Sequence, residues 1–130
     1  MNIFLIISLL FTSNQLFAGD TMEVREAKPR LLYGTASFYS NSFNGKKTAN
    51  GEIYSHKKMT AACNVLPLGT WIKVTNLRNG RSVIVKTNDR LHSRMKRVVD
   101  LSGEAANKLG YMKSGLTRVR VEVIGKKKPE

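Results

Sequence analysis

The chain has 130 residues and carries 22 Lys and Arg against 9 Asp and Glu, a formal net charge of +13. This length fits one domain, and 42% hydrophobic residues argue for a packed core and against disorder of the whole chain. Its single cysteine excludes an internal disulfide framework and a cysteine-based zinc finger. The charge favours an anionic partner, such as nucleic acid, a phospholipid surface or an acidic polysaccharide, although scattered lysines also serve solubility alone.

The N-terminal segment is typical of a secretory signal peptide. Residues 1–18 carry no charged side chain, residues 3–10 are almost wholly apolar, and Ala18 is a suitable last residue before cleavage. The alternative is a buried N-terminal helix, because the segment lacks a basic start and has Leu16 near the cut. We expect 1–18 to be a signal peptide and 19–32 a flexible leader. We also expect export to a bacterial periplasm or cell envelope without a lipid anchor, which argues against nucleic acid as the partner.

Strand patterns follow in chain order. Residues 33–39 are rich in aromatic and β-favouring side chains and predict a strand, whereas the polar residues 41–52 predict a long loop. Residues 71–77 and 81–87 flank Asn79-Gly80, a dipeptide that favours the tight turn between two antiparallel strands. Residues 118–123 alternate valine with charge, which predicts a half-buried strand.

One short helix is predicted between the hairpin and the last strand. Ser102 can cap residues 103–109, Glu104 lies in the first turn, and Gly110 can end the helix. The tail 125–130 is basic and expected to be solvated. Many short strands and one helix predict a small, mainly β barrel and not a βαβ fold.

Few residues are available for catalysis. His56 and His92 lack metal-ligand spacing, so we expect neither a metal nor another cofactor. Among the carboxyls, Asp100 precedes the helix cap, where bonds to nearby backbone amides are expected, and Glu52 belongs to a polar loop. Asp89 follows a β-branched strand, at a position from which a carboxyl can face a cleft. The pattern alone leaves open whether Asp89 instead pairs with Arg90 or caps the loop.

Several stretches together resemble the rare lipoprotein A (RlpA) family of double-psi β-barrels. The resemblance covers about residues 33–124 in order, and its motifs are Gly34-Thr35-Ala36-Ser37-Phe38-Tyr39, Phe43-Asn44-Gly45-Lys46-Lys47-Thr48-Ala49-Asn50-Gly51-Glu52, Leu66-Pro67-Leu68-Gly69-Thr70, Val74-Thr75-Asn76-Leu77-Arg78-Asn79-Gly80-Arg81-Ser82-Val83, Asn88-Asp89-Arg90, Val99-Asp100-Leu101-Ser102 and Val119-Arg120-Val121-Glu122-Val123.

The resemblance implies a six-stranded double-psi β-barrel with one or two short helices, shared in outline with expansins. It also implies endolytic cleavage of the MurNAc–GlcNAc bonds of peptide-free peptidoglycan strands to 1,6-anhydro products. The family's catalytic aspartate falls on Asp89, flanked by Asn88 and Arg90. The implied substrate groove passes Tyr39, Thr48, Asn50, Gly51 and Glu52.

The chain departs from the family pattern beside the candidate acid. Cys63 stands where the family has a histidine, and Leu91-His92 replaces the usual Gly-Pro after Asn-Asp-Arg. His92 either takes over part of the missing imidazole's role or is a solvent-exposed loop residue. Cys63 is expected to be buried in a monomer, to link two copies through a disulfide or, least favoured, to act as a thiol nucleophile.

Three functions therefore stay open, of which the least favoured is a basic protein that acts at the envelope surface and leaves the groove unused. The leading one is a lytic transglycosylase, which needs one carboxyl where a hydrolase needs two. The alternative is a non-catalytic, expansin-like module that binds cell-wall glycan. Peptide-free strands carry a carboxylate on each muramic acid, so a groove lined by cations would follow them. The residues expected to line it are Lys46, Lys47, Lys57, Lys58, Arg94 and Lys96.

Overall fold

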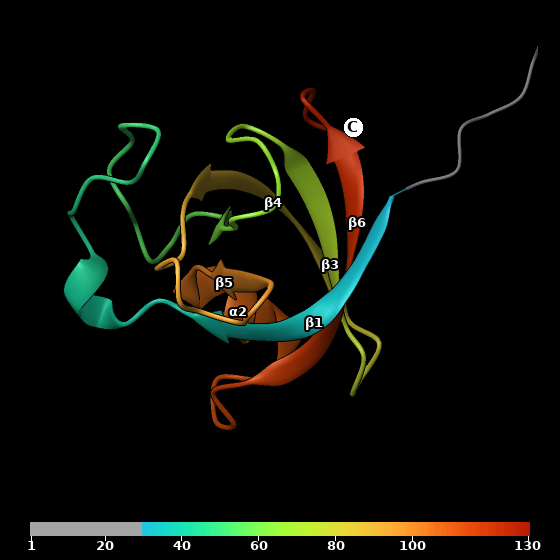
Figure 1. Ribbon diagram of the computed structural model, residues 1–130. Helices are drawn as coiled ribbons and strands as arrows, with labels where there is room; N and C mark the ends of the chain where they lie inside the picture. Colours follow the sequence, from blue (N-terminus) through green and yellow to red (C-terminus); the bar gives the residue numbers. More distant parts are fainter. Residues whose placement is uncertain (1–29) are drawn as a thin grey trace, which may run out of the picture.

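The computed structural model describes residues 30–130, which form a closed barrel of six strands with one α-helix (Figure 1). The strands neighbour one another in the order β1-β5-β2-β4-β3-β6. In chain order the elements are β1 (Leu31–Phe38), the 3-10 helix η1 (Asn41–Phe43), β2 (Thr60–Ala62), β3 (Trp71–Asn76), β4 (Ser82–Asp89), β5 (Val99–Leu101), α2 (Gly103–Leu109) and β6 (Thr117–Gly125). The expected signal peptide, 1–18, lies outside the described residues.

The predicted hairpin is confirmed. β3 and β4 pair antiparallel with Val74 opposite Val83, and Gly80 adopts a φ of 79° in the connecting turn. The Gly80 amide donates to the Asn76 carbonyl at 2.7 Å. Glycine at this position meets the positive φ without a steric penalty.

Each of the two short strands, β5 and β2, joins a longer strand by parallel pairing, and these pairs close the barrel. β1 runs parallel to β5, and β2 runs parallel to β4, whereas the other neighbours are antiparallel. β2 and β5 have three residues each. A strand this short has too little alternation to be recognised from the sequence, so its position is decided by the neighbours that it joins.

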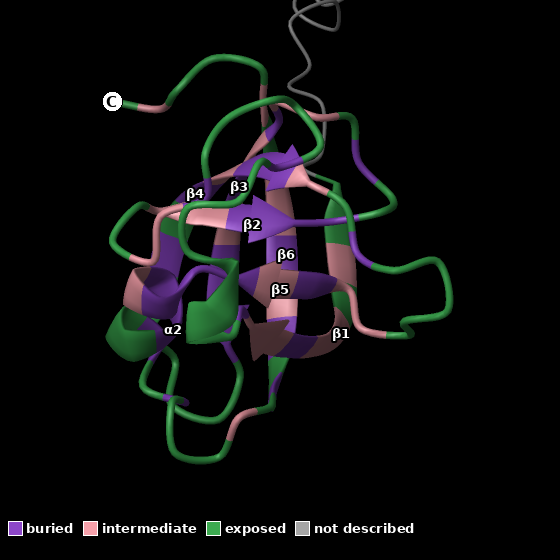
Figure 2. Cartoon of the chain, turned by 90° about the vertical axis from the view of Figure 1, so that its left-hand side faces the viewer, coloured by how far each residue is buried: buried purple, intermediate pink, exposed green. Residues whose placement is uncertain are grey.

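The predicted helix and last strand are also confirmed. The Ser102 hydroxyl accepts from the Ala105 amide, and Gly110 ends α2 with a φ of 80°. Buried and exposed positions alternate along β4 and the first half of β6 (Figure 2). Val119 and Val121 of β6 are fully buried, so they and the inward residues of the other strands make the core.

The barrel extends beyond the predicted boundaries at both ends. β1 starts at Leu31, inside the segment expected to be a leader, because residues 31 and 32 pair with β6. β6 continues to Gly125, and the tail after it is not simply solvated. The Lys126 ammonium donates to the Leu68 carbonyl at 2.8 Å, and Lys128 lies 5.8 Å above the centre of the Trp71 ring. Among the described residues, no helix is both long and apolar enough to span a membrane.

Candidate active site

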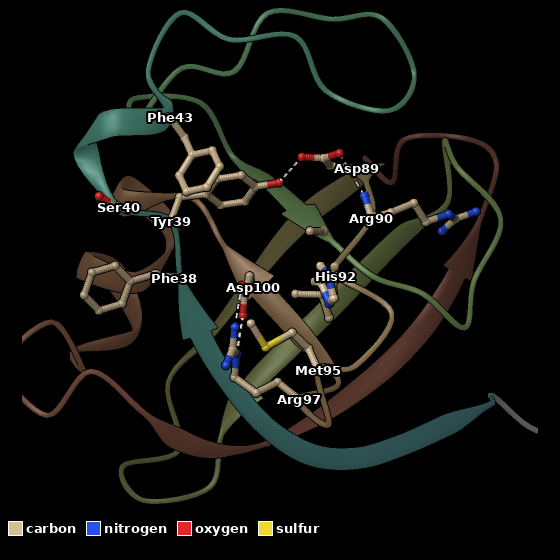
Figure 3. Close-up of a pocket in the computed structure, with 12 residues that line it drawn as sticks. Phe38, Tyr39, Ser40, Phe43, Asp89, Arg90, His92, Met95, Arg97 and Asp100 are labelled. Carbon is tan, nitrogen blue, oxygen red and sulfur yellow. Dashed lines mark hydrogen bonds and ion pairs between the residues drawn. The ribbon is translucent and has the colours of Figure 1, made fainter.

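Asp89 is the last residue of β4, where the barrel opens (Figure 3). One carboxylate oxygen accepts from the Tyr39 hydroxyl at 2.6 Å. The other accepts from the backbone amides of Ala49 and Arg90, both at 2.9 Å. The carboxyl at the end of β4 is thus held by three hydrogen-bond donors that come from three parts of the chain.

The Arg90 side chain turns away from Asp89. Its guanidinium donates to the backbone carbonyls of Cys63 and Leu66, the latter at 2.6 Å. Of the two structural alternatives for Asp89, the ion pair with Arg90 is therefore absent, whereas the carboxylate does cap the loop through backbone amides. Arg90, although adjacent to Asp89 in sequence, thus holds the segment 63–66 in place.

A wall of aromatic rings supports the carboxyl. Tyr39 is 8% exposed and stacks on Tyr54, with ring centres 4.1 Å apart, and Phe43 meets it edge-on at 5.6 Å. The Tyr54 hydroxyl accepts from the Gly103 amide and is 2.6 Å from His56 Nδ1. Burial, followed by the hydrogen bond to Asp89, raises the pKa of Tyr39 far above its ordinary value. Tyr39 therefore stays protonated and remains a donor to Asp89.

A cavity of about 550 Å³ lies in front of Asp89. Its lining residues are Phe38, Tyr39, Ser40, Phe43, Ala62, Asp89, Arg90, Leu91, His92, Met95, Arg97 and Asp100. The cavity brings together four of the predicted site residues, Tyr39, Asp89, Arg90 and His92. The other eight were missed, because β1, β2, β5 and two loops meet here only in the folded barrel.

Asp100 is the second carboxyl at this cavity. The prediction that it bonds to backbone amides is wrong. Its two oxygens accept from Arg97 Nε at 2.8 Å and Arg97 Nη2 at 3.1 Å. The hydrogen bond to Asp100 raises the pKa of Arg97. Asp100 is thus engaged in a fork-like ion pair, whereas Asp89 is held by neutral donors.

The loop predicted to bind substrate instead braces the site. Thr48 Oγ1 donates to Asn50 Oδ1 at 2.6 Å, and Asn50 Nδ2 donates to Glu52 Oε1 at 2.5 Å. The bond from Asn50, and to a smaller extent the nearby Lys86 charge, lowers the pKa of Glu52, and partial burial opposes this shift. Gly51, with a φ of 90°, closes the turn. Thr48, Asn50, Gly51 and Glu52 therefore do not line the cavity but hold the Ala49 amide against Asp89.

Asn88, the residue before Asp89, contacts the 48–52 loop through its backbone. It is 3% exposed, and its carbonyl accepts from the Asn50 amide at 3.2 Å. Its side-chain Oδ1 is buried and has no hydrogen-bond partner among the described residues. Asn88 is thus a neighbour of the catalytic candidate through the backbone and not a group in the cavity.

Cys63 is fully buried in the hydrophobic core. Its amide donates to the Asp89 carbonyl at 3.0 Å, so it adjoins the site through the backbone alone. A buried thiol has no surface for attack on a substrate or for a disulfide between two copies. The structure therefore contradicts both of those alternatives for Cys63 and supports the buried thiol.

His92 lines the cavity and is exposed, which combines the two predicted alternatives. Its Nδ1 accepts from the Arg94 amide at 3.2 Å, so the neutral ring carries its proton on Nε2. None of the six cations expected to line the groove lines this cavity. Lys46 borders it, 5.6 Å from the centre of the Phe43 ring.

Of the two carboxyls at the cavity, Asp89 is the one without an ion pair among the described residues. Within residues 30–130, no group of three or more His, Cys, Asp or Glu side chains is placed to hold a metal ion. A closed six-stranded barrel of mixed parallel and antiparallel pairing, with one α-helix, matches the double-psi β-barrel class.

Comparison with known proteins then identifies the family. The family model described as lytic transglycolase matches residues 32–121, and the chain belongs to this family. The chain is 50% identical over 101 residues to the endolytic peptidoglycan transglycosylase RlpA of Pseudomonas aeruginosa strain UCBPP-PA14, covering 78% of this chain and 30% of that protein. It is 48% identical over 104 residues to the Pasteurella multocida protein of the same name, covering 80% and 35%. The chain thus spans about a third of the length of these relatives.

Solved structures agree on the fold. An expansin from Clavibacter michiganensis superimposes with a TM-score of 0.61 at 21% identity, covering 77% of this chain and 53% of that one. The Streptomyces papain inhibitor superimposes with a TM-score of 0.60 at 20% identity, covering 73% and 94%. At these identities the likeness supports the barrel fold alone.

Proposed function

We propose that this protein is an endolytic lytic transglycosylase that cleaves the MurNAc–GlcNAc bonds of peptide-free peptidoglycan strands. The observation that carries the proposal is the position of Asp89, at the mouth of the cavity with Tyr39 bonded to its carboxylate at 2.6 Å. The relatives named as endolytic peptidoglycan transglycosylases support the reaction class.

In the proposed reaction Asp89 acts first as an acid and then as a base. Protonated Asp89 gives its proton to the glycosidic oxygen as the bond to the muramic acid C1 breaks. The resulting carboxylate then takes the proton of the C6 hydroxyl while that oxygen forms a bond to C1. The product is a 1,6-anhydro sugar, no water is consumed, and Asp89 is protonated again. Tyr39 stays protonated throughout and holds the carboxyl in place.

The state of Asp100 favours this route over hydrolysis. Direct hydrolysis of a glycosidic bond ordinarily uses two carboxyls, one as an acid and the other as a base or nucleophile. Asp100 is the other carboxyl at the cavity, and both of its oxygens accept from Arg97. A carboxylate committed to a bidentate pair is a poor base, so Asp89 is left as the single acid and base.

The test compares the wild type with the Asp89→Asn variant on purified peptide-free glycan strands. Mass spectrometry should find anhydro-ended fragments with the wild type and none with Asp89→Asn. Glu122→Gln, on the half-exposed face of β6, is a matched control that should retain full activity. Fragments from Asp89→Asn at the wild-type rate would contradict the assignment of Asp89.

The second candidate function is a non-catalytic module that binds cell-wall glycan. The observation that favours it is the carboxylate environment of Asp89, which accepts from three donors and so suits a fixed binding group as well. The expansin-like barrel is consistent with this reading. Strand binding by the wild type without any fragments would establish the module and exclude the enzyme.

We also propose that His92 assists Asp89, since its exposed ring lines the same cavity and carries a proton on Nε2. His92→Ala should lower turnover several-fold without changing the melting temperature. Turnover equal to that of the wild type would remove His92 from the mechanism.

The reaction would take place in the bacterial periplasm or cell envelope, a location supported by the uncharged apolar segment 1–18. Cell fractionation and N-terminal sequencing of the protein produced in its host test this location. A cytoplasmic protein that begins at Met1 would contradict it.

A further inference from the structure

A second cavity, of about 510 Å³, lies on the outer wall of the barrel. It is formed by β2, β3, β4 and the C-terminal tail, away from the residues that line the Asp89 cavity. Its lining residues are Lys58, Met59, Thr60, Trp71, Ile84, Lys86, Lys128, Pro129 and Glu130. It therefore combines an apolar floor with three lysines and one glutamate.

The floor of this cavity is an unusual surface for the outside of a barrel. Trp71 is the first residue of β3, lies opposite Lys86 of β4, and is only partly buried. Ile84 beside it is 39% exposed. An aromatic ring beside an aliphatic patch suits a sugar, which presents C–H groups on its faces.

The charges at the cavity select an anionic sugar. Lys58 and Lys86 line the cavity together with Trp71, and Lys128 Nζ lies 5.8 Å from the centre of the Trp71 ring. Opposed to these three cations, only Glu130 of the lining residues is acidic. A polymer with a carboxylate on every second sugar would gain from this excess of positive charge.

The Trp71 cavity is close enough to Asp89 for one glycan strand to contact both. Lys86 precedes Asp89 by three residues on β4, a separation of about 10 Å along an extended strand. Lys86 is 3.8 Å from Glu52, which belongs to the loop that places the Ala49 amide on Asp89. The two cavities thus flank one braced loop, and a strand of a few sugars spans this distance.

We propose that the Trp71 cavity is a second binding site for an anionic glycan, in which a sugar ring contacts Trp71 beside the Lys128 ammonium and Lys58 and Lys86 attract muramic acid carboxylates. The inference rests on the proposed function, because that function supplies the glycan. The site would hold the strand while Asp89 acts on a bond a few sugars away, and thus favour long strands over short ones.

The tryptophan itself provides the test, because Trp71 is the sole tryptophan of the chain. The full-length Asp89→Asn variant is titrated with peptide-free glycan strands while tryptophan emission is recorded, and binding is measured in parallel by co-sedimentation with insoluble strands. A saturable change of emission at the concentration that gives binding is the expected result. Binding without a change of emission would overturn the Trp71 site and leave the proposed function standing. No binding by either method would count against both.

Variants of the cavity give a second readout. Trp71→Ala in the Asp89→Asn background should weaken binding roughly tenfold, a loss of about 1.4 kcal/mol, and Trp71→Phe should restore part of it. Tyr33→Ala is the matched control, since Tyr33 is an aromatic residue of β1 that is 58% exposed and lines neither cavity. Circular dichroism of each variant confirms folding. Equal affinity of the folded Trp71→Ala variant would overturn the proposal.

The choice of ligand distinguishes glycan from other polyanions. A neutral chitin oligosaccharide should change the emission at a concentration at least threefold higher and with little dependence on salt, because it lacks the carboxylates. A single-stranded oligonucleotide should require still higher concentrations. An equal response to the oligonucleotide would overturn the assignment to a glycan.

Discussion

The Tyr39 hydroxyl donates a hydrogen bond of 2.6 Å to the carboxylate of Asp89, which lies 50 residues further along the chain. The bond joins the segment after β1 to the end of β4 across the mouth of the cavity. Because Tyr39 is itself pinned between Tyr54 and Phe43, the carboxyl is held by a rigid donor. This relationship makes Tyr39 a positioning residue for the proposed acid.

Tyr39→Phe should therefore lower turnover on peptide-free strands by about tenfold to a hundredfold, the loss expected for one hydrogen bond to a charged group. The ring remains, so the stacking on Tyr54 and the melting temperature should change little. Rates measured with the two enzymes across a pH series test this. A parallel fall in melting temperature of several degrees would instead assign Tyr39 a structural role.

Alkaline pH should destabilise the protein through its buried tyrosines. Burial raises the pKa values of Tyr39, Tyr54 and Tyr111 above the ordinary 10.0, so above that pH the unfolded chain releases protons that the folded chain retains. The stability contributed by each tyrosine is complete below about pH 10 and falls by about 1.4 kcal/mol per pH unit above it. Urea unfolding between about pH 9 and about pH 11 measures this slope. Tyr111→Phe should make the slope shallower, and an unchanged slope would contradict its burial.

Arg90 should stabilise the fold through the hydrogen bonds that its side chain donates, and not through its charge alone. Its guanidinium donates to two backbone carbonyls, those of Cys63 and Leu66, which have no comparable partner once it is removed. Arg90→Ala should reduce the free energy of unfolding by about 2 kcal/mol. Arg90→Lys should recover little, because a lysine ammonium lies one bond closer to the backbone than Nη1, the nitrogen that donates to both carbonyls. Arg94→Lys is the control, because Arg94 is an exposed arginine of the loop that follows Arg90. Full recovery by the lysine variant would show that charge alone is required.

Gly103 is the first residue of α2, where alanine is ordinarily favourable. A Cβ at this position would lie 2.2 Å from His56 Nε2, and the imidazole cannot retreat freely because Nδ1 is bonded to the Tyr54 hydroxyl. Gly103→Ala should therefore cost about 1–3 kcal/mol of unfolding free energy. It should also disturb Tyr54 and, through the stack, Tyr39. Thermal unfolding beside the exposed control Lys108→Ala measures the effect, and a gain in stability would contradict this packing.

The Cys63 thiol should be unreactive in the native protein, because the residue is fully buried. A thiol reagent should label it only as fast as the chain unfolds, and labelling should become immediate in denaturant. A non-reducing gel of the native protein should show the monomer alone. Rapid native labelling or a disulfide-linked dimer would contradict the buried position.

The local elements could be predicted from the sequence because each depends on neighbouring residues. Asn79-Gly80 specifies the turn of the β3–β4 hairpin, Ser102 and Gly110 bound α2, and the alternating valines of β6 mark its buried face. The two three-residue strands depend on which neighbours they join, and the resemblance to a family of known barrels supplied what periodicity could not. The same resemblance singled out Asp89, which the pattern of residues alone left undecided.

The sequence by itself determined that this is one basic, mainly β domain, and its resemblance to the family made Asp89 the candidate acid. Only the tertiary structure decided how that acid is surrounded. It placed Tyr39 on the carboxylate, turned Arg90 toward backbone carbonyls, paired Asp100 with Arg97 and buried Cys63. Each of these outcomes depends on the direction of a side chain and on contacts between segments far apart in the chain. Closure of the barrel sets both, and no spacing along one segment records them.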